Sequence, residues 1–381
     1  MRVGNDLSTI VVNAWAKVGS TEAAEQAEGL LNRMLSPGNK RRVQPDAVVF
    51  NAVINAWATS KDPSAGKNAA GLLRKMKKLA VEEDYDTYPD IVTYNSVLSA
   101  WSHSGDPQAA AQTEKIVQEM QKTSEESDTA PTPNTITYNT ILHAWSKSTL
   151  PGAAIRAQKV LDYMIETGED IAPDVISFGS VLDAWAKSKE PHKAARTRDL
   201  LDQLLELYDR TKSPSLKPTL ILYNSVLNAC AFSALGTSLE EQREALQIAV
   251  TTFSNVRKSN IHPDTVTYGN MLKGLANLMP QGTVRTQMAL QIFSKCVEEG
   301  LVGNLVWNEV RRAVPSRQLE ETFRLKRGSC GHLQLRDLPK SWKRNRFEKN
   351  APKNRRKEKE VHAQRPITTI IETAAQSGRD L

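Results

Sequence analysis

Cysteine is scarce in this sequence, with three residues, Cys230, Cys296 and Cys330, among 381. They lie far apart, without a CxxC pair and without a histidine at ligand spacing. A disulfide framework and a zinc site are therefore not expected, and a reducing compartment is the default. Long apolar runs are also missing: none reaches the roughly 18 residues of a membrane-spanning helix, so we expect no membrane partner.

Catalytic motifs are missing as well. None of the six histidines is followed two residues later by glutamate, as a zinc deaminase requires. After residue 304 the only aspartates are Asp337 and Asp380, too few for the clustered aspartates of a metal-dependent nuclease. GxxxxGK[ST] and HExxH are both absent from the sequence. We therefore expect no enzyme activity, no catalytic residue, no metal and no cofactor.

Positive charge is uneven along the chain. The net charge of +7 hides a basic stretch at 324–359, which holds 14 Lys and Arg against three acidic residues. Residues 1–323 hold 34 basic and 37 acidic residues. The pI alone would therefore overstate the case for nucleic-acid binding along the first 323 residues.

One short pattern recurs through the chain. PDIVTYNSVLSAW at 89–101 has counterparts at 45–57, 133–145, 173–185, 218–230 and 263–275, and NDLSTIVVNAW at 5–15 is a shorter first copy. Successive copies are 40 to 45 residues apart, measured between their closing Trp, Cys or Leu residues. Periods of this length are typical of solenoids, in which each unit packs only on its neighbours.

Residues 89–122 show how one copy folds. Asp90 and Thr93 are suited to the start of a helix, and Tyr94, Val97, Leu98 and Trp101 recur at the spacing of one apolar helix face. Gly105 and Pro107 end that helix, and a second amphipathic segment follows with Ala110, Ile116, Val117 and Met120. The copy therefore predicts a helical hairpin that must stack on its neighbours, with the recurrent Trp and Tyr in the core.

This pattern predicts an all-α chain of two parts. Residues 1–314 form an array of about seven hairpins, closed by a partial hairpin that begins in GNLVWNEVRRAV at 303–314. Residues 315–381 form a basic, largely disordered tail.

An asparagine follows the buried aromatic in four copies, at Asn51, Asn95, Asn139 and Asn224. It lies off the apolar stripe, and asparagine is a poor helix former, so packing and propensity do not explain it. A hydrogen bond to the backbone of the first turn is one explanation. The other is an amide edge presented to a base, and the spacing alone leaves both open.

The start PDIVTYN, the paired helices and the closing Pro-Asp resemble pentatricopeptide repeats over about residues 5–310. The resemblance implies a right-handed α-solenoid whose first helices line a groove for single-stranded RNA, one nucleotide per repeat. It implies a reading pair in each repeat, formed by the residue after the aromatic and the closing residue. The pairs are Thr9 with Asp46, Asn51 with Asp90, Asn95 with Asn134, Asn139 with Asp174, Gly179 with Thr219, Asn224 with Asp264, and Gly269 with Asn304.

The resemblance also implies that aliphatic residues two positions after each closing residue sandwich the base. These are Val48, Val92, Ile136, Ile176, Ile221 and Val266. By the family's tendencies, Asn with Asp favours U, Asn with Asn a pyrimidine, and Thr with Asp G. The expected site is G-U-Y-U-N-U-N from the 5′ end. Its fifth and seventh positions accept any nucleotide, because Gly179 and Gly269 offer no side chain.

The chain departs from the family in two respects. Its repeats run 40 to 45 residues instead of about 35, which could weaken the register of one repeat per base. Its array begins almost at Met1, without an Arg-rich leader or a signal peptide. A mitochondrial or plastid location is therefore implied by the resemblance alone.

The basic stretch LKRGSCGHLQLRDLPKSWKRNRFEKNAPKNRRKEKE at 325–360 has two interpretations. It is either a nonspecific phosphate-contacting extension or, without a role on RNA, a disordered, solvated charge run or a nuclear-import-like basic patch. For the whole chain, the leading hypothesis is a monomeric, sequence-preferring RNA-binding adaptor in organellar RNA processing, stability or translation. The alternatives are a protein-binding helical scaffold and a structural subunit associated with an organellar ribosome, and other RNA-processing proteins are candidate partners.

Overall fold

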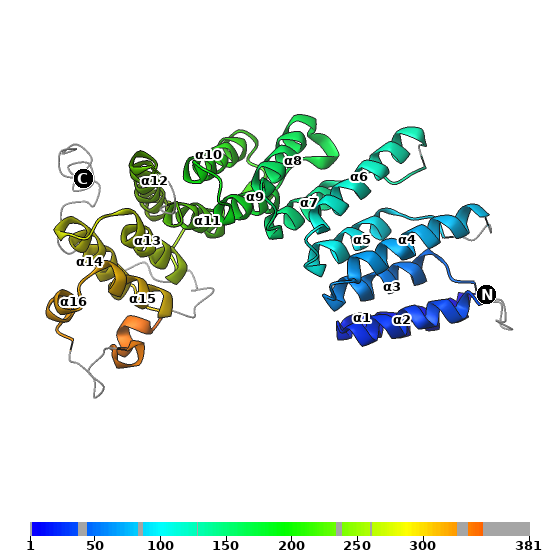
Figure 1. Ribbon diagram of the computed structural model, residues 1–381, viewed down its shortest axis with the longest axis horizontal. Coiled ribbons are helices and arrows are strands. Elements are labelled where there is room, and N and C mark those ends of the chain that lie inside the picture. Colours follow the sequence, from blue (N-terminus) through cyan, green and yellow to red (C-terminus); the bar gives the residue numbers. More distant parts are fainter. Residues whose placement is uncertain are drawn as a thin grey trace. The chain divides into compact units, whose positions relative to one another are not determined.

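The computed structural model of the chain describes residues 2–36, 44–82, 87–127, 129–233, 238–259, 261–325 and 334–345. Over these ranges the secondary structure is helical, with sixteen α-helices, four short 3₁₀ turns and no strand (Figure 1). The predicted all-α solenoid class is confirmed.

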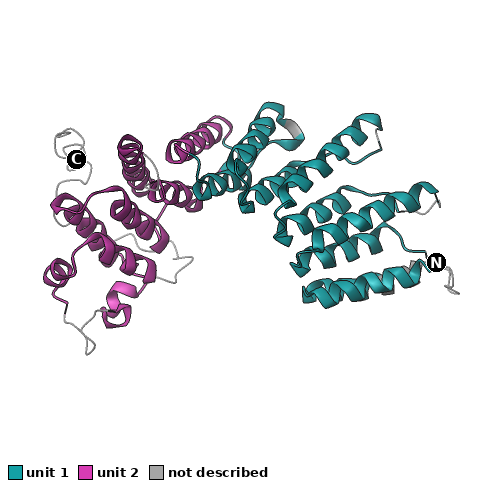
Figure 2. Ribbon diagram, viewed as in Figure 1, with its two compact units in different colours: residues 1–190, 212–216 teal, residues 191–211, 217–381 magenta. Residues whose placement is uncertain are grey.

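The chain divides into two compact units, shown in two colours in Figure 2. Unit 1 comprises residues 1–190 and 212–216, and unit 2 comprises residues 191–211 and 217–381. The helices of unit 1 are α1 (Arg2–Val18), α2 (Thr21–Met34), α3 (Ala47–Ser60), α4 (Ala65–Glu82), α5 (Ile91–Ser104), α6 (Ala109–Glu126), α7 (Thr135–Lys147), α8 (Ala153–Thr167) and α9 (Val175–Lys187). Two 3₁₀ turns also belong to it, η1 (Glu169–Ile171) and η2 (Pro214–Leu216).

Unit 2 begins with a long helix and ends with short ones. Its helices are α10 (Lys193–Thr211), α11 (Leu220–Ala231), α12 (Leu239–Lys258), α13 (Thr265–Leu278), α14 (Thr283–Glu298), α15 (Asn304–Ala313) and α16 (Ser316–Phe323). Two 3₁₀ turns follow, η3 (Leu335–Asp337) and η4 (Lys340–Lys343).

The odd-numbered helices are the first helices of the hairpins, and most of them start at the recurrent Asp or Asn. The side chain of Asp90 accepts a hydrogen bond from the backbone N–H of Thr93, and the Thr93 hydroxyl accepts one from the backbone N–H of Asp90. The same reciprocal capping occurs at Asn134, Asp174 and Asp264. These bonds satisfy backbone donors that a helix leaves unpaired at its start, so the repeated motif fixes where each helix begins.

The apolar stripe predicted for residues 89–122 is buried as expected. Tyr94, Val97, Leu98 and Trp101 are each at most 5% exposed, and Val117 and Met120 of α6 are buried opposite them. Trp57, Trp145 and Trp185 are buried in the same way. The recurrent aromatic residues are therefore core residues, as predicted.

First helices pack on one another along each unit. In unit 1, α1 contacts α3, α3 contacts α5, α5 contacts α7, and α7 contacts α9. In unit 2, α11 contacts α13, and α13 contacts α15. Equivalent residues of consecutive first helices therefore line up on one face of each unit.

The predicted tail from residue 315 holds folded elements in its described parts. Helix α15 lies where the closing hairpin was expected to begin, the short helix α16 follows it, and Leu319 of α16 is buried. Trp342 of η4 packs edge-to-face on Phe293 and on Phe323. These apolar side chains explain why this part of the basic segment folds on the array. Residues 326–333 and 346–381 of the predicted tail lie outside the described residues.

Within the described ranges, none of the helices combines the length and the apolar character needed to cross a membrane.

Candidate nucleic-acid interface

A row of aliphatic side chains on the first helices points to solvent. Its members are the six predicted sandwiching residues, Val48, Val92, Ile136 and Ile176 in unit 1 and Ile221 and Val266 in unit 2. Their exposed fractions run from 43% to 72%, whereas the aromatic residue two positions later is buried in every case. An exposed β-branched side chain in the first turn does not stabilise the helix. Each unit therefore presents a line of apolar surface that internal packing does not explain.

Beside this row, Asn51 forms a side-chain clasp with the start of the next first helix. Its Nδ2 donates to Asp90 Oδ1 over 3.2 Å, and its Oδ1 accepts from the Thr93 hydroxyl over 2.6 Å. The predicted pair of Asn51 and Asp90 is thus in direct contact. The asparagine bonds to the following repeat, not to the backbone of its own first turn.

The pair of Asn139 and Asp174 has the same arrangement. Asn139 Nδ2 donates to Asp174 Oδ1 over 3.1 Å, and the Ser177 hydroxyl donates to Asn139 Oδ1 over 2.6 Å. Both asparagines are half-exposed. The clasp therefore holds the amide at the surface of the first helices.

Asn95 and Asn134 show a variant of the clasp in which the closing residue is neutral. The Thr137 hydroxyl lies 2.8 Å from Asn95 Oδ1 and 3.1 Å from Asn134 Oδ1. Here one hydroxyl connects the two predicted reading residues.

In unit 2, Asn224 shows the opposite variant. Its Nδ2 donates to Asp264 Oδ1 over 3.3 Å. The Thr267 hydroxyl donates to Asp264 Oδ1 over 2.9 Å. Asn224 Oδ1 is buried and accepts no hydrogen bond among the described residues. The carboxylate alone therefore holds this amide.

The closing aspartates keep one oxygen open. In Asp90 and Asp174, Oδ1 accepts from backbone N–H and from the asparagine, and the hydroxyl oxygens of Thr93 and Ser177 lie 2.8 and 3.1 Å from it. Among the described residues, no hydrogen bond reaches their Oδ2. Asn Nδ2 also carries two hydrogens, of which the aspartate takes one. Each pair therefore presents an open donor and an open acceptor side by side.

The three remaining predicted pairs are different. Thr9 lies half-exposed on α1, and Asp46 caps α3 through the backbone N–H of Val49. Gly179 lies in unit 1 and Thr219 in unit 2. Gly269 is buried, and a Cβ at this position would lie 2.4 Å from Leu305 Cγ. Close packing of α13 on α15 thus explains this glycine, while Asn304 is exposed at the start of α15.

A second row of polar side chains, not singled out from the sequence, lies one and two turns further along the first helices. The rings of His103 of α5 and His143 of α7 lie side by side at a tilt of 39°, with their centroids 5.3 Å apart. Burial lowers the pKa of His143, and His103 and Lys147 lower it further. Lys187 forms an ion pair with Asp183. Their spacing in the sequence could have indicated this row. These residues follow the reading position by four or eight residues, and such positions lie on the same helix face.

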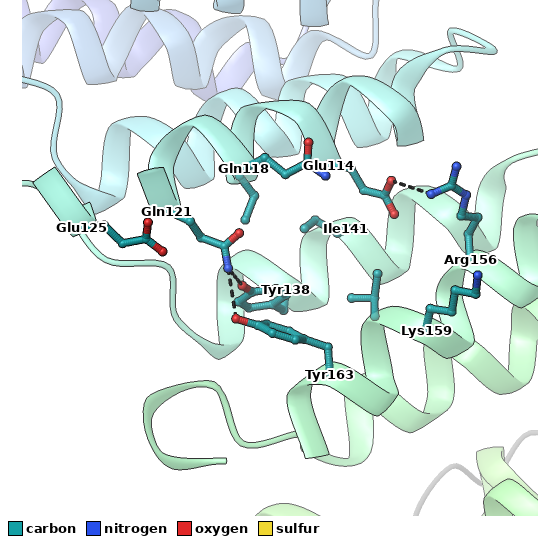
Figure 3. A pocket seen from close by; sticks show the side chains of 11 residues that line it. Glu114, Gln118, Gln121, Glu125, Tyr138, Ile141, Arg156, Lys159 and Tyr163 are labelled. Atoms are coloured by element: carbon teal, nitrogen blue, oxygen red, sulfur yellow. Dashed lines mark hydrogen bonds and ion pairs between the residues drawn. The ribbon is translucent and has the colours of Figure 1, made fainter. Parts of the chain in front are cut away.

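A pocket of about 420 Å³ lies between α6 and α8 in unit 1 (Figure 3). Gln121 donates to the hydroxyls of Tyr138 and Tyr163, and Arg156 pairs with Glu114 at the rim. Burial raises the pKa of Tyr138. The pocket is lined mainly by second helices, whereas the clasps lie on the first helices.

No group of three or more His, Cys, Asp or Glu in the described residues could hold a metal ion. Cys230 and Cys296 are free and buried, and burial raises the pKa of Cys230 to about 12. Such thiols are poor nucleophiles, because the thiolate is the reactive form. Cys330 lies outside the described residues.

The family model of the pentatricopeptide repeat domain matches residues 72–148 of this sequence. The match includes α5, α6 and α7, with Asn95, Asn134 and Asn139. It confirms the resemblance seen in the repeated motif. No curated protein sequence matches the chain.

Solved structures of one protein are similar to the chain. The crystal structure of the pentatricopeptide repeat protein PPR10 from maize is 20% identical, with a TM-score of 0.47, over 84% of this chain and 42% of that one. Two crystal structures of PPR10 in complex with an 18-nt psaJ RNA element, one carrying three Cys-to-Ser substitutions, are 19% identical with TM-scores of 0.42. These two matches cover 84% of this chain and 44% of the PPR10 chain. The chain therefore spans less than half the length of these proteins.

Proposed function

We propose that this chain, which carries pentatricopeptide repeats, binds single-stranded RNA and reads it one nucleotide per repeat. The observation that carries the proposal is the Asn–Asp clasp beside an exposed aliphatic residue, as at Asn51, Asp90 and Val92. Unpaired bases need an apolar surface for their faces and hydrogen-bonding groups for their edges. A scaffold for peptides would not need this combination to recur along the first helices.

The open groups of the clasp match uracil. Asn Nδ2 can donate to a uracil carbonyl, and the free Asp Oδ2 can accept from uracil N3–H. Cytosine would place its N3 acceptor against the carboxylate, which is unfavourable. This pattern supports U at the repeats of Asn51, Asn139 and Asn224. At Asn95 the closing Asn134 is neutral and its amide can donate or accept, which supports either pyrimidine.

The proposed target is G-U-Y-U-N-U-N, read from the 5′ end. Its second, fourth and sixth nucleotides fall on the Asn–Asp pairs. The fifth and seventh nucleotides fall on Gly179 and Gly269, which offer no side chain.

Asn139→Thr tests the assignment at the fourth nucleotide. It replaces an amide with a hydroxyl beside Asp174, the combination that by family tendency favours G. We expect the preference at that nucleotide to move from U to G. The binding free energies of the two RNAs should differ by about 1–3 kcal/mol. Kd values for a set of RNAs that differ only at the fourth nucleotide measure this shift.

Asn32→Thr is the matched control, because Asn32 is an exposed asparagine of the second helix α2. It should leave all preferences unchanged. An Asn139→Thr protein that binds every RNA of the set as the parent does would refute the pairing.

We further propose that the chain acts as a non-catalytic adaptor in organellar RNA processing, stability or translation, in mitochondria or plastids. Crosslinking followed by sequencing of the bound RNA tests this role. Enrichment of segments that carry the proposed target in organellar transcripts supports it, and recovery of ribosomal RNA fragments throughout would favour a ribosomal subunit.

A further inference from the structure

The amide of a reading asparagine can point either way. Rotation about its last side-chain bond exchanges an acceptor for a donor, so the pattern offered to a base depends on what holds the amide. Two groups of the following repeat can hold it in this protein, the closing residue and the hydroxyl three residues later. The four asparagines sample different combinations of the two.

The hydroxyl has a defined role in the clasp of Asn51. Thr93 Oγ1 accepts from the backbone N–H of Asp90, so its single hydrogen remains available for donation. Asn51 Oδ1 lies 2.6 Å away and Asp90 Oδ1 lies 2.8 Å away. Donation to the amide oxygen leaves Nδ2 directed at the carboxylate. The hydroxyl and the carboxylate therefore favour the same orientation.

The hydroxyls are shielded from water. Thr93, Thr137 and Ser177 are all fully buried. A hydrogen bond at such a place is stronger than one in water, because the local dielectric is low. Removing the hydroxyl would leave the amide oxygen without its donor.

We propose that the hydroxyls of Thr93, Thr137 and Ser177 are positioning groups that set the orientation of the base-reading amides of Asn51, Asn95 and Asn139. This inference rests on the proposed function and adds a specificity determinant from outside the reading pair. Each hydroxyl belongs to the repeat that follows the asparagine it holds.

The contribution of the hydroxyl to base preference should differ between repeats. Asn51 and Asn139 contact both a hydroxyl and a carboxylate. Asn95 is held by the Thr137 hydroxyl, and its closing residue carries no charge. Preference at the third nucleotide should therefore depend on its hydroxyl most strongly.

Asn224 supplies a matched control within the chain. Thr267 caps α13 as Thr137 caps α7, with the same reciprocal bonds to the closing residue. Its hydroxyl bonds to Asp264 and not to Asn224. Thr267→Val therefore removes a capping hydroxyl without removing an amide contact.

The experiment compares Thr137→Val with Thr267→Val, two substitutions of the same size and shape. The readout is the Kd for an RNA with a purine at the matching nucleotide divided by the Kd for an RNA with a pyrimidine there. The matching nucleotide is the third for Thr137 and the sixth for Thr267. Thr137→Val should reduce its ratio about three- to tenfold, the equivalent of one hydrogen bond. Thr267→Val should leave its ratio unchanged, although both variants should lose thermal stability.

Thr137→Ser keeps the hydroxyl and should restore the ratio, which a general packing defect would not allow. NMR of the Asn95 side-chain amide, recorded without RNA, should show a shift in Thr137→Val and none in Thr267→Val.

The outcomes separate the two claims. A parent protein that prefers a pyrimidine at the third nucleotide, with the preference intact in Thr137→Val, overturns the positioning role and leaves the proposed function standing. A parent protein that binds no RNA, or binds without preference, overturns both. Equal losses in Thr137→Val and Thr267→Val would assign the effect to capping and overturn the positioning role.

Discussion

The indole N–H groups of the recurrent tryptophans show how single residues satisfy a buried core. Trp57, Trp145 and Trp185 donate to the side chains of Glu28, Glu114 and Gln158 on the preceding second helices. A buried tryptophan normally finds such a partner. Trp101 does not find one among the described residues, because Ala70 of α4 occupies the equivalent position.

Ala70→Gln is therefore expected to stabilise the protein. The new side chain should accept from Trp101 Nε1 as Gln158 accepts from Trp185, with a gain of about 0.5–1.5 kcal/mol. Thermal unfolding followed by circular dichroism measures the gain. Ala70→Met, of similar size but without the oxygen, is the control. Equal melting temperatures for the two variants would contradict the expectation.

A second prediction at this scale concerns His143. Burial, His103 and Lys147 lower its pKa, Lys187 lowers it too, and Asp183 opposes them. The unfolded chain therefore binds a proton more readily than the folded one near and below the ordinary imidazole pKa of about 6.5. Stability should fall as pH drops through that value, because the state that binds more protons is then favoured.

The His143→Gln variant should lose less stability than the parent between pH 7.5 and pH 5.5. Melting temperatures across this range provide the measurement, with pH 8 as the reference at which the imidazole is neutral in both states. Parallel pH profiles for the two proteins would show that His143 does not contribute.

At the scale of elements, the approach of α13 to α15 depends on a glycine. A Cβ at Gly269 would lie 2.4 Å from Leu305 Cγ and 2.5 Å from Leu305 Cδ2. The same helix contains Gly274, where a Cβ would meet no atom within 4 Å. Packing therefore excludes a larger residue at Gly269 and leaves room for one at Gly274.

Alanine should act in opposite directions at these two sites. Gly269→Ala should destabilise unit 2 by about 1–3 kcal/mol through overpacking against α15. Gly274→Ala should stabilise it by about 0.5–1 kcal/mol, since alanine favours the helix. Urea unfolding of both variants tests the pair. Stabilisation by both substitutions would show that α15 tolerates the added methyl group.

Helix starts are the other feature of this scale, and the sequence predicts them well. The Asp-x-x-Thr spacing at Asp90 and Asp264 is local, so the cap forms wherever the motif occurs. Thr219 departs from this rule: its side chain makes no cap hydrogen bond to α11.

At the scale of the whole molecule, the described part of the C-terminal segment closes the repeat array of unit 2. Trp342 joins Phe293 and Phe323 in one aromatic cluster, and its backbone carbonyl accepts from the N–H of Val302 over 2.8 Å. Asn345 donates to the carbonyls of Gly300 and Glu299. A repeat array needs such a cap, because its terminal repeat lacks a neighbour on one side.

Removal of this cap should destabilise unit 2. Trp342→Ala is expected to cost about 2–4 kcal/mol, somewhat less than a fully buried tryptophan because the side chain is half-buried. Chemical denaturation measures the loss. Lys340→Ala, at an exposed position of the same 3₁₀ turn, should have almost no effect. Equal stability for the two variants would mean that residues 334–345 contribute no cap.

The sequence alone determined the repeating hairpins, their caps and their buried stripes. These features follow from patterns within about 15 residues, such as an aromatic followed by apolar residues at helical spacing. The reading pairs were expected from the family resemblance, and three of them, at Asn51, Asn139 and Asn224, are in hydrogen-bonding contact. Their role in reading bases stays a prediction.

Only the tertiary structure decided which group holds each amide. The partners Asn51 and Thr93 are 42 residues apart, and their contact depends on how closely two first helices approach. The same holds for Gly269 against Leu305 and for Trp342 against Phe293, the contact that folds part of the basic segment. Distances between helices arise from the packing of many side chains at once, and no local pattern of residues specifies them.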